Sequence, residues 1–277
     1  MLLAGAKQGM NNNILVETIR SCVIPRAKPC VNISGGIDST IVLHHLLEKC
    51  KEPIYTYTVG FDGQEKEFEY AAQVASHYKT RHKEILIENM LDIYPEILSW
   101  FNRPQFNLWP YWAAKQAKQD GRLNCYIGEG GDEHFGGYWY KQQMSYPEVW
   151  AHLFQYVDPA YQIIYKHFGI GLHAPLHPSN LRFNVTYPYY DHDQEKKFIR
   201  EAYRGILPDF VLERRKLNGR KDYWVIWEQE LQKYFPEAQP LSEVDIIELW
   251  NLWVTREWLK THDAIKIQTH EALLRQR

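Results

Sequence analysis

Short apolar runs alternate with segments of helical spacing along the first half of the chain. Four runs have the length and composition of buried strands: Cys30–Ile33, Ile54–Phe61, His82–Ile87 and Leu123–Ile127. Helical spacing lies before, between and after them, over Ile14–Ile24, Ser39–Lys51, Glu67–Tyr78, Tyr94–Phe101 and Tyr111–Gln119. Because strands that alternate with helices form parallel sheets, we expect an α/β fold, a parallel twisted sheet with helices on both faces.

The pattern changes near Tyr140. Beyond this residue strand-like runs fade and helical spacing dominates, as in EVDIIELWNLWVTREWLKTHDAIK. We therefore predict an α/β core over residues 1–140 and a mostly helical part over residues 141–277, which adds a C-terminal helical subdomain. The proline-rich stretch His173–Tyr190 is predicted to be a loop that crosses over the functional face of the core.

Composition excludes several classes of protein. Of the 277 residues, 45% are hydrophobic and 24% are charged, which is typical of a folded soluble chain. The net charge of −2 provides no strong basic field, so a nucleic-acid partner is not expected. No run approaches the roughly 20 apolar residues of a membrane span, so no membrane partner is expected either. The 4 cysteines are scattered without a C-x-x-C pair, which favours a reducing, cytoplasmic location.

The stretch SGGIDST, Ser34–Thr40, lies where the first predicted strand is followed by a helix. Glycines at such a turn let the backbone approach an anion, and the helix directs its free N–H groups toward that anion. Asp38 would repel a phosphate unless a cation lay between them, and Mg²⁺ binds both carboxylate and phosphate oxygens. Asp38 is therefore a candidate Mg²⁺ ligand. From these residues alone, a tight turn with Asp38 as helix N-cap is an equal alternative.

A second glycine-rich stretch, GEGGDEHFGGY at Gly128–Tyr138, follows the fourth predicted strand. Ligands of open α/β sheets gather at the carboxyl ends of the strands, where both stretches are expected. We therefore predict that Asp132 binds the same Mg²⁺ as Asp38. The alternative is a flexible acidic turn at the surface.

The two stretches together resemble one family. SGGIDS lacks the lysine of a Walker A loop and the G-x-G-x-x-G of a dinucleotide fold, but it resembles the S-G-G-x-D-S loop of the N-type ATP pyrophosphatases. GEGGDEHFGGY resembles G-E-G-[SG]-D-E-x-F-G-G-Y of the asparagine synthetase synthetase domain. VTYPYYDHDQEKKF and LPDFVLERRKLNGR resemble that family's Y-P-[FY]-x-D and L-P-x-x-[VI]-x-x-R-x-K segments. The resemblance covers Asn13–Asp222 and implies an adenine nucleotide alpha hydrolase-like fold.

The resemblance also implies a reaction and a set of binding residues. The family adenylates a carboxylate with ATP, releasing pyrophosphate, and an amine then displaces AMP to form an amide. The residues that match the pyrophosphate loop are Ser34, Gly35, Gly36, Asp38 and Ser39, and those that match the Mg²⁺ ligands are Asp38 and Asp132. The backbone positions that match the adenine site are Ile33, Val59 and Gly128.

Two further residues match catalytic positions of the family. Glu129 stands where asparagine synthetases carry a glutamate, and a carboxylate there can orient an amine and take its proton. Lys216, in ERRKLNGR, matches the catalytic lysine, whose ammonium stabilises charge that develops during bond exchange. From charge alone, this stretch is a solvated basic loop.

The sequence also departs from the family. The phosphate loop begins at Ser34, and we expect no glutaminase domain before it. The nitrogen source is then free ammonia, a separate glutaminase partner or another amine. Arg103 replaces the acid that the family carries before Pro104, so it could bind an anionic substrate or pair with Glu129 or Asp132. Aspartate is thus in doubt as the small-molecule carboxylate.

Two other functions stay open. One is an adenylating enzyme that modifies RNA or nucleobases, and the other is a non-catalytic nucleotide-binding subunit. The thiolating versions of the first generally need paired cysteines, which this chain lacks. Retention of Asp38, Asp132, Glu129 and Lys216 argues against the second. His44 and His45 are consecutive on a predicted helix, so their side chains point apart and a shared metal site is not expected.

Overall fold

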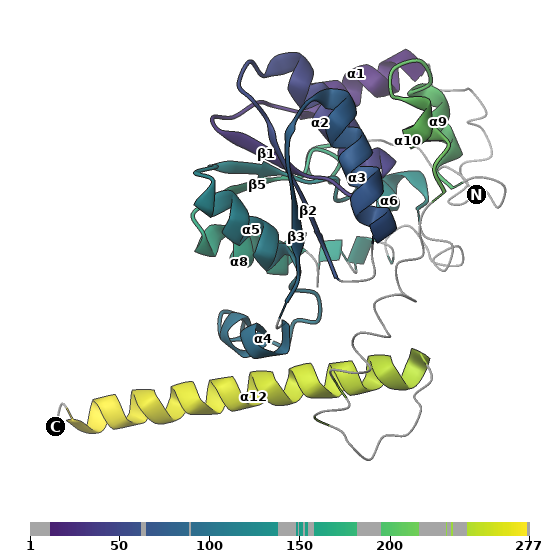
Figure 1. The fold of residues 1–277 in the computed structure, drawn as a ribbon. Coiled ribbons are helices and arrows are strands. Elements are labelled where there is room, and N and C mark those ends of the chain that lie inside the picture. The colour runs from purple at the N-terminus through teal and green to yellow at the C-terminus, as the bar shows by residue number, and fades with distance from the viewer. Residues whose placement is uncertain are drawn as a thin grey trace, which may run out of the picture.

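The computed structural model contains a five-stranded parallel sheet (Figure 1). It describes residues 12–61, 65–88, 90–137, 148, 150–151, 153–154, 158–181, 195–215, 231, 234 and 243–275. The strands are β1 (Pro29–Asn32), β2 (Tyr55–Gly60), β3 (Arg81–Leu86), β4 (Asn124–Tyr126) and β5 (Gly171–His173). The helices in these ranges are α1 (Asn12–Cys22), α2 (Ile37–Lys49), α3 (Glu65–Tyr78), α4 (Met90–Leu98), α5 (Pro110–Gln119), α6 (Gly131–Phe135), α8 (Asp158–His167), α9 (Lys197–Ala202), α10 (Asp209–Leu212) and α12 (Glu243–Arg275).

The strand order is β3-β2-β1-β4-β5, so β1 lies at the centre of the sheet. Cys30 of β1 is in register with Tyr55 of β2 on one side and with Cys125 of β4 on the other. The chain runs outward from β1 to β2 and β3, and later returns to the other side of β1 as β4. The connections after β1 and after β4 therefore leave the same carboxyl edge on diverging paths, which opens a crevice between them.

Helices cover both faces of the sheet, because successive strand residues point to opposite sides. Cys30 belongs to a core formed with α4, α5, α8 and α12, whereas its neighbour Val31 belongs to a core formed with α1, α2, α3, α9 and α10. Both residues are fully buried. The alternation recurs in β4, where Cys125 contributes to the first core and Tyr126 to the second.

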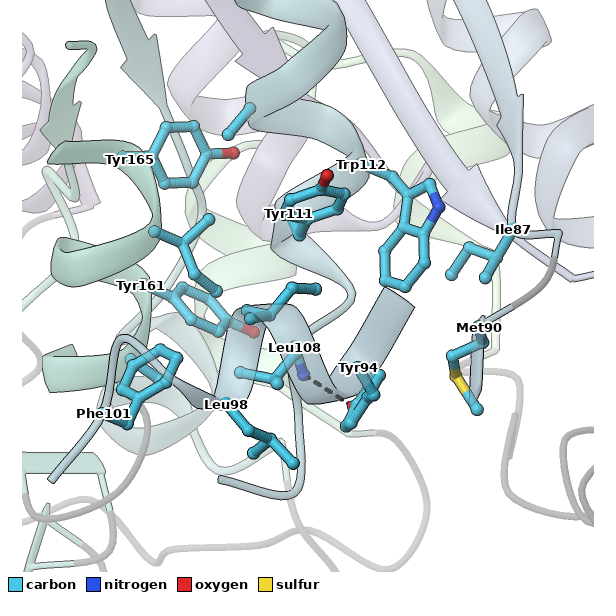
Figure 2. Close-up of a cluster of buried hydrophobic side chains, with 14 of the residues drawn as sticks. Ile87, Met90, Tyr94, Leu98, Phe101, Leu108, Tyr111, Trp112, Tyr161 and Tyr165 are labelled. Atoms are coloured by element: carbon cyan, nitrogen blue, oxygen red, sulfur yellow. Dashed lines mark hydrogen bonds between the residues drawn. The ribbon is translucent and has the colours of Figure 1, made fainter. Parts of the chain in front are cut away.

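Aromatic side chains fill the first of these cores (Figure 2). The hydroxyl of Tyr94 accepts a hydrogen bond from the backbone N–H of Leu108 at 3.0 Å, which satisfies a polar group in an apolar cluster. The rings of Trp250 and Trp253 lie 5.0 and 6.0 Å from the Tyr94 ring, and they dock α12 against α4. Figure 1 shows the 33-residue helix α12 as a rod that extends past α4. None of the helices in the described ranges combines the length and hydropathy that a membrane span needs.

The structure confirms the predicted α/β class, with a parallel sheet and helices on both faces. Each of the four predicted strands is present and shifts by only a residue at either end. β5 was not indicated by the sequence, because Leu172 is the only apolar side chain among its 3 residues, whereas β4 lies within the apolar run Leu123–Ile127. It joins the sheet from beyond residue 140, and the division into two parts there stays a prediction. The predicted loop His173–Tyr190 lies outside the described residues after Leu181.

Candidate active site

The two glycine-rich loops lie against each other at the carboxyl edge of the sheet, after β1 and after β4. Glycine is needed at their contact because the two backbones approach closely. A Cβ on Gly128 would lie 2.7 Å from the backbone nitrogen of Ser39, and a Cβ on Gly131 would lie 2.5 Å from the carboxyl carbon of Asp38. The contact therefore lies where the strand order reverses, the usual ligand position in open α/β sheets.

Local hydrogen bonds fix the loop that follows β1. Gly35 has a φ of +67°, and a Cβ there would lie 2.6 Å from the backbone of α3. The hydroxyl of Ser39 accepts a hydrogen bond from the N–H of Ser34 at 3.3 Å, and the hydroxyl of Thr40 donates to the carbonyl of Gly36 at 2.7 Å. The 13-residue helix α2 begins directly after this turn, so the loop has the build of an anion site.

A cleft of about 480 Å³ is lined by both loops. Its walls include Ile33, Val59 and Gly128, the three positions expected to frame an adenine base. Trp109 and Tyr161 also line it, and their rings meet edge to face at 5.8 Å. Strand-end backbone, apolar side chains and the phosphate loop thus border one space, which suits a planar base joined to phosphates.

Asp38 and Asp132 converge on one point at the border of this cleft. The ammonium nitrogen of Lys196 lies 2.6 Å from Oδ1 of Asp132 and also contacts Oδ2 of Asp38. Two carboxylate oxygens that point at one cation form a donor set that fits Mg²⁺. These residues can hold a divalent ion only if the ammonium moves away, and their role as Mg²⁺ ligands stays a prediction.

Lys196 has an unusual backbone conformation and a buried side chain. It adopts φ 56° and ψ 32° at the N-cap of α9, in the left-handed region that residues with a Cβ rarely enter. Its side chain is only 5% exposed. Burial disfavours the charged form, but the charges of Asp132 and Asp38 outweigh burial and raise the pKa of Lys196 above its usual value. Lys196 is therefore a charged ammonium at neutral pH.

Glu129 begins the second loop and lines the same cleft. Tyr161 is buried near it: burial first, and then the charge of Glu129, raise the pKa of the Tyr161 hydroxyl well above its usual range. Tyr161 is therefore a neutral phenol that keeps its proton at neutral pH. A carboxylate in the position of Glu129 can take a proton from an amine bound in the cleft.

The family to which this chain belongs follows from a match to a family model. The model described as asparagine synthase matches residues 12–183, more than half of the chain. The chain belongs to the asparagine synthase family. The matched range contains both glycine-rich loops.

Three individual proteins similar to this member of the asparagine synthase family share 30% of their aligned residues with it or fewer. A Methanocaldococcus jannaschii protein named as a putative glutamine-hydrolyzing asparagine synthetase is 30% identical over an alignment of 115 residues, and the match covers 38% of this chain and 22% of that protein. An NMN synthetase structure from Francisella tularensis has a TM-score of 0.44 at 15% identity, covering 90% of this chain and 94% of the other. An NH3-dependent NAD synthetase from Campylobacter jejuni, in complex with nitrate, has a TM-score of 0.42 at 13% identity, covering 88% and 93%.

A second, smaller space of about 200 Å³ lies beside the phosphate loop of this family member. Asp38 and Asp132 line both spaces and so form their common border. The smaller space is lined by four cations, Lys196, Arg200, Arg214 and Arg215, and by four acids, Asp38, Glu67, Asp132 and Glu195. The guanidinium of Arg214 donates a hydrogen bond to the carbonyl of Ser34 at 2.7 Å and lies 4.2 Å from the Tyr70 ring. Cations beside the phosphate loop suit a diphosphate group.

Two residues that the sequence analysis raised are not placed in the site by the described part of the chain. Lys216, the predicted catalytic lysine, lies outside the described residues, although Arg215 lines the smaller space. Arg103 is described, but it is not among the residues that line either space. The role of Arg103 as a substrate ligand stays a prediction.

His44 and His45 do share a partner, so the expectation that their side chains point apart was wrong. Their ring nitrogens and the Glu48 carboxylate lie within 4.8 Å of one another. Arg20 Nε lies 3.1 Å from Glu48, so the carboxylate already has a cationic partner. The other nitrogen of His45 shares a hydrogen bond with the Tyr203 hydroxyl at 2.8 Å. The cluster thus links α2 to Tyr203 at the end of α9.

Sequence reasoning missed Lys196, Arg214 and Tyr161. Lys196 lies in VTYPYYDHDQEKKF, one of the segments that resemble the family, but nothing there distinguishes it from Lys197. Arg214 stands at the arginine of the family pattern that ends in Lys216, so a signal was present, but only Lys216 of that stretch was given a role. Tyr161 carries no motif signal, since its position in the cleft depends on how α8 packs.

Proposed function

We propose that this chain is an ATP-dependent, AMP-forming amide ligase. A carboxylate oxygen of the substrate attacks the α-phosphorus of ATP, and pyrophosphate leaves. The nitrogen of an amine then attacks the acyl carbon, and AMP leaves. The observation that carries the proposal is the convergence of Asp38 and Asp132, from two separate loops, beside one cleft. The amine is ammonia, free or delivered by a separate glutaminase, or another small amine.

The phosphate loop binds the leaving diphosphate in this proposal. The hydroxyls of Ser34 and Ser39 and the N–H groups at Gly35 and Gly36 donate to phosphate oxygens, supported by the positive end of α2. Bound by Asp38 and Asp132, Mg²⁺ supplies positive charge that stabilises the departing diphosphate. The guanidinium groups bordering the smaller space bind the same anion after it is released.

The other end of the ATP and the second substrate share the larger cleft. Backbone groups at Ile33, Val59 and Gly128 bind the adenine edge, while the apolar side chains cover its faces. Glu129 takes the proton that the amine loses as the amide forms. The ammonium of Lys216 stabilises the negative charge that develops on the acyl and phosphate oxygens.

Carboxylate-dependent ATP–pyrophosphate exchange across a panel of acids tests the proposal. Exchange is expected with one chemical class of acid, with AMP rather than ADP as the nucleotide product when amine is added. Binding of ATP without exchange for any acid would overturn the proposal in favour of a non-catalytic subunit. Exchange or ATP turnover that requires added tRNA would overturn it in favour of an RNA-modifying enzyme.

A further inference from the structure

One buried charge in the site has no part in the reaction proposed above. Lys196 places its ammonium between the carboxylates of Asp38 and Asp132, 2.6 Å from the latter. Gly137 helps to make room for it, because a Cβ there would collide with the Asp132 carboxylate and lie 2.6 Å from Cε of Lys196. Backbone strain, burial and a fitted glycine together indicate a built position rather than a chance contact.

The position of this ammonium matters for metal binding. Mg²⁺ and Mn²⁺ need carboxylate oxygens at close to 2 Å, in about the place that the Lys196 nitrogen occupies. Two cations cannot share that place, because their charges repel strongly at short range in a partly buried site. The Asp38–Asp132 pair thus has an internal cation already.

We propose that Lys196 is a built-in counter-cation, which keeps divalent ions off Asp38 and Asp132 until the phosphates of a nucleotide draw its ammonium away. The part of the inference that concerns the nucleotide rests on the proposed function. The part that concerns exclusion of the ion from the nucleotide-free protein does not depend on it. In this role Lys196 is a positioning residue: it couples metal entry to nucleotide binding.

The smaller space borders the phosphate loop, so a phosphate bound there offers Lys196 an alternative partner. Lys196 lines that space together with Ser34 and Gly36 of the phosphate loop. A diphosphate bound there brings oxygens close to the ammonium, and the four-carbon stem of lysine lets the nitrogen turn without movement of α9. The carboxylates are then left to the ion that arrives with the nucleotide.

Mn²⁺ titration of the nucleotide-free protein, followed by electron paramagnetic resonance, tests the inference. Lys196→Met keeps an unbranched side chain that is one atom shorter and removes its charge, and is expected to bind Mn²⁺ about tenfold or more tightly than the parent protein. Lys197→Met is the matched control, since Lys197 is exposed, and its Mn²⁺ affinity is expected to equal that of the parent. Adding Asp38→Asn to Lys196→Met is expected to abolish the gain.

Equal Mn²⁺ affinities of the parent and Lys196→Met would overturn the inference, as would a gain that survives Asp38→Asn. If Lys196→Met does not fold, the parent and Asp38→Asn can be compared without nucleotide. The inference expects equal, weak Mn²⁺ binding by both, and tighter binding by the parent would overturn it. These titrations involve no turnover. A failed pyrophosphate exchange assay would therefore refute the proposed function without deciding whether Lys196 excludes Mn²⁺, which the titrations decide.

Discussion

Gly131 lies directly against Asp38: a Cβ on Gly131 would come within 2.5 Å of both the carboxyl carbon and Oδ1 of Asp38. The carboxylate of one loop is thus positioned by the backbone of the other. The two glycine-rich stretches are 90 residues apart in sequence and act as one surface because the sheet brings β1 and β4 together.

Gly131→Ala tests this contact. The backbone of Gly131 is not in the left-handed region, so alanine fits the helix and the cost falls on the position of Asp38. We expect pyrophosphate exchange to fall about a hundredfold, because misplacement by an ångström has an effect of that size. Gly205→Ala is the control: Gly205 has φ +77° and open space, so it should lower thermal stability and leave exchange unchanged. Normal exchange by Gly131→Ala would contradict the assigned contact.

Asp38→Asn and Asp132→Asn should each lower pyrophosphate release about a hundredfold or more, since each removes a carboxylate assigned to hold the Mg²⁺ whose positive charge would stabilise the leaving diphosphate. Pyrophosphate release measured at saturating ATP checks this. Asp92→Asn, an exposed aspartate on α4, serves as the control and should release pyrophosphate at the parent rate. Near-normal release by either site variant would remove that residue from the metal site.

The fold class and the position of the site could be predicted because their signals are local. Buried strands such as Cys30–Ile33 show as apolar runs, and α2 shows as helical spacing after a glycine turn. Parallel strands must place their carboxyl ends on one edge, so Asp38 and Asp132 could be expected to meet there. Pattern and topology together therefore indicate where the two glycine-rich loops meet.

The rest depends on contacts that no local pattern records. Lys196 is 158 residues from Asp38 in sequence, and its direction follows from a left-handed backbone at the start of α9. The short strand β5 forms because β4 offers it a ready edge, not because 3 residues have a strong preference. Tyr161 reaches the cleft through the packing of α8 against α5, which sequence spacing does not specify.

His45 should make stability depend on pH. Burial lowers the pKa of His45, and the hydrogen bond to Glu48 opposes this only in part. Below the ordinary histidine pKa of about 6.5, the unfolded chain therefore binds a proton that the folded chain does not, and the free energy of unfolding falls as pH falls. The contribution is at most about 1.4 kcal/mol per pH unit.

Urea unfolding of the parent and His45→Gln between pH 8 and pH 5 checks the sign. The variant should show a shallower fall in the free energy of unfolding. At pH 8 this histidine is neutral in the folded and unfolded states. The difference in the free energy of unfolding between parent and variant at that pH therefore measures only the cost of the changed packing. A steeper fall in the variant would show that the folded protein favours the protonated ring.

Lys216→Ala should leave ATP binding intact and lower turnover by roughly a hundredfold to a thousandfold, since the assigned ammonium acts on charge that develops during reaction. Equilibrium ATP binding and single-turnover AMP formation separate the two effects. Lys51→Ala, an exposed lysine beyond α2, is the control and should match the parent in both. An unchanged turnover number for Lys216→Ala would exclude the lysine from the mechanism.

Glu129→Gln should separate the two half-reactions. Glutamine has the same shape and still forms hydrogen bonds, but it cannot take a proton from the amine. Adenylation needs no such base, so ATP–pyrophosphate exchange should stay near the parent rate while amide formation falls about a hundredfold or more. The exposed Glu88→Gln, in the segment after β3, should change neither rate. Equal losses in both assays would place Glu129 in acid activation, whereas no loss in either would mean that the amine loses its proton to another group.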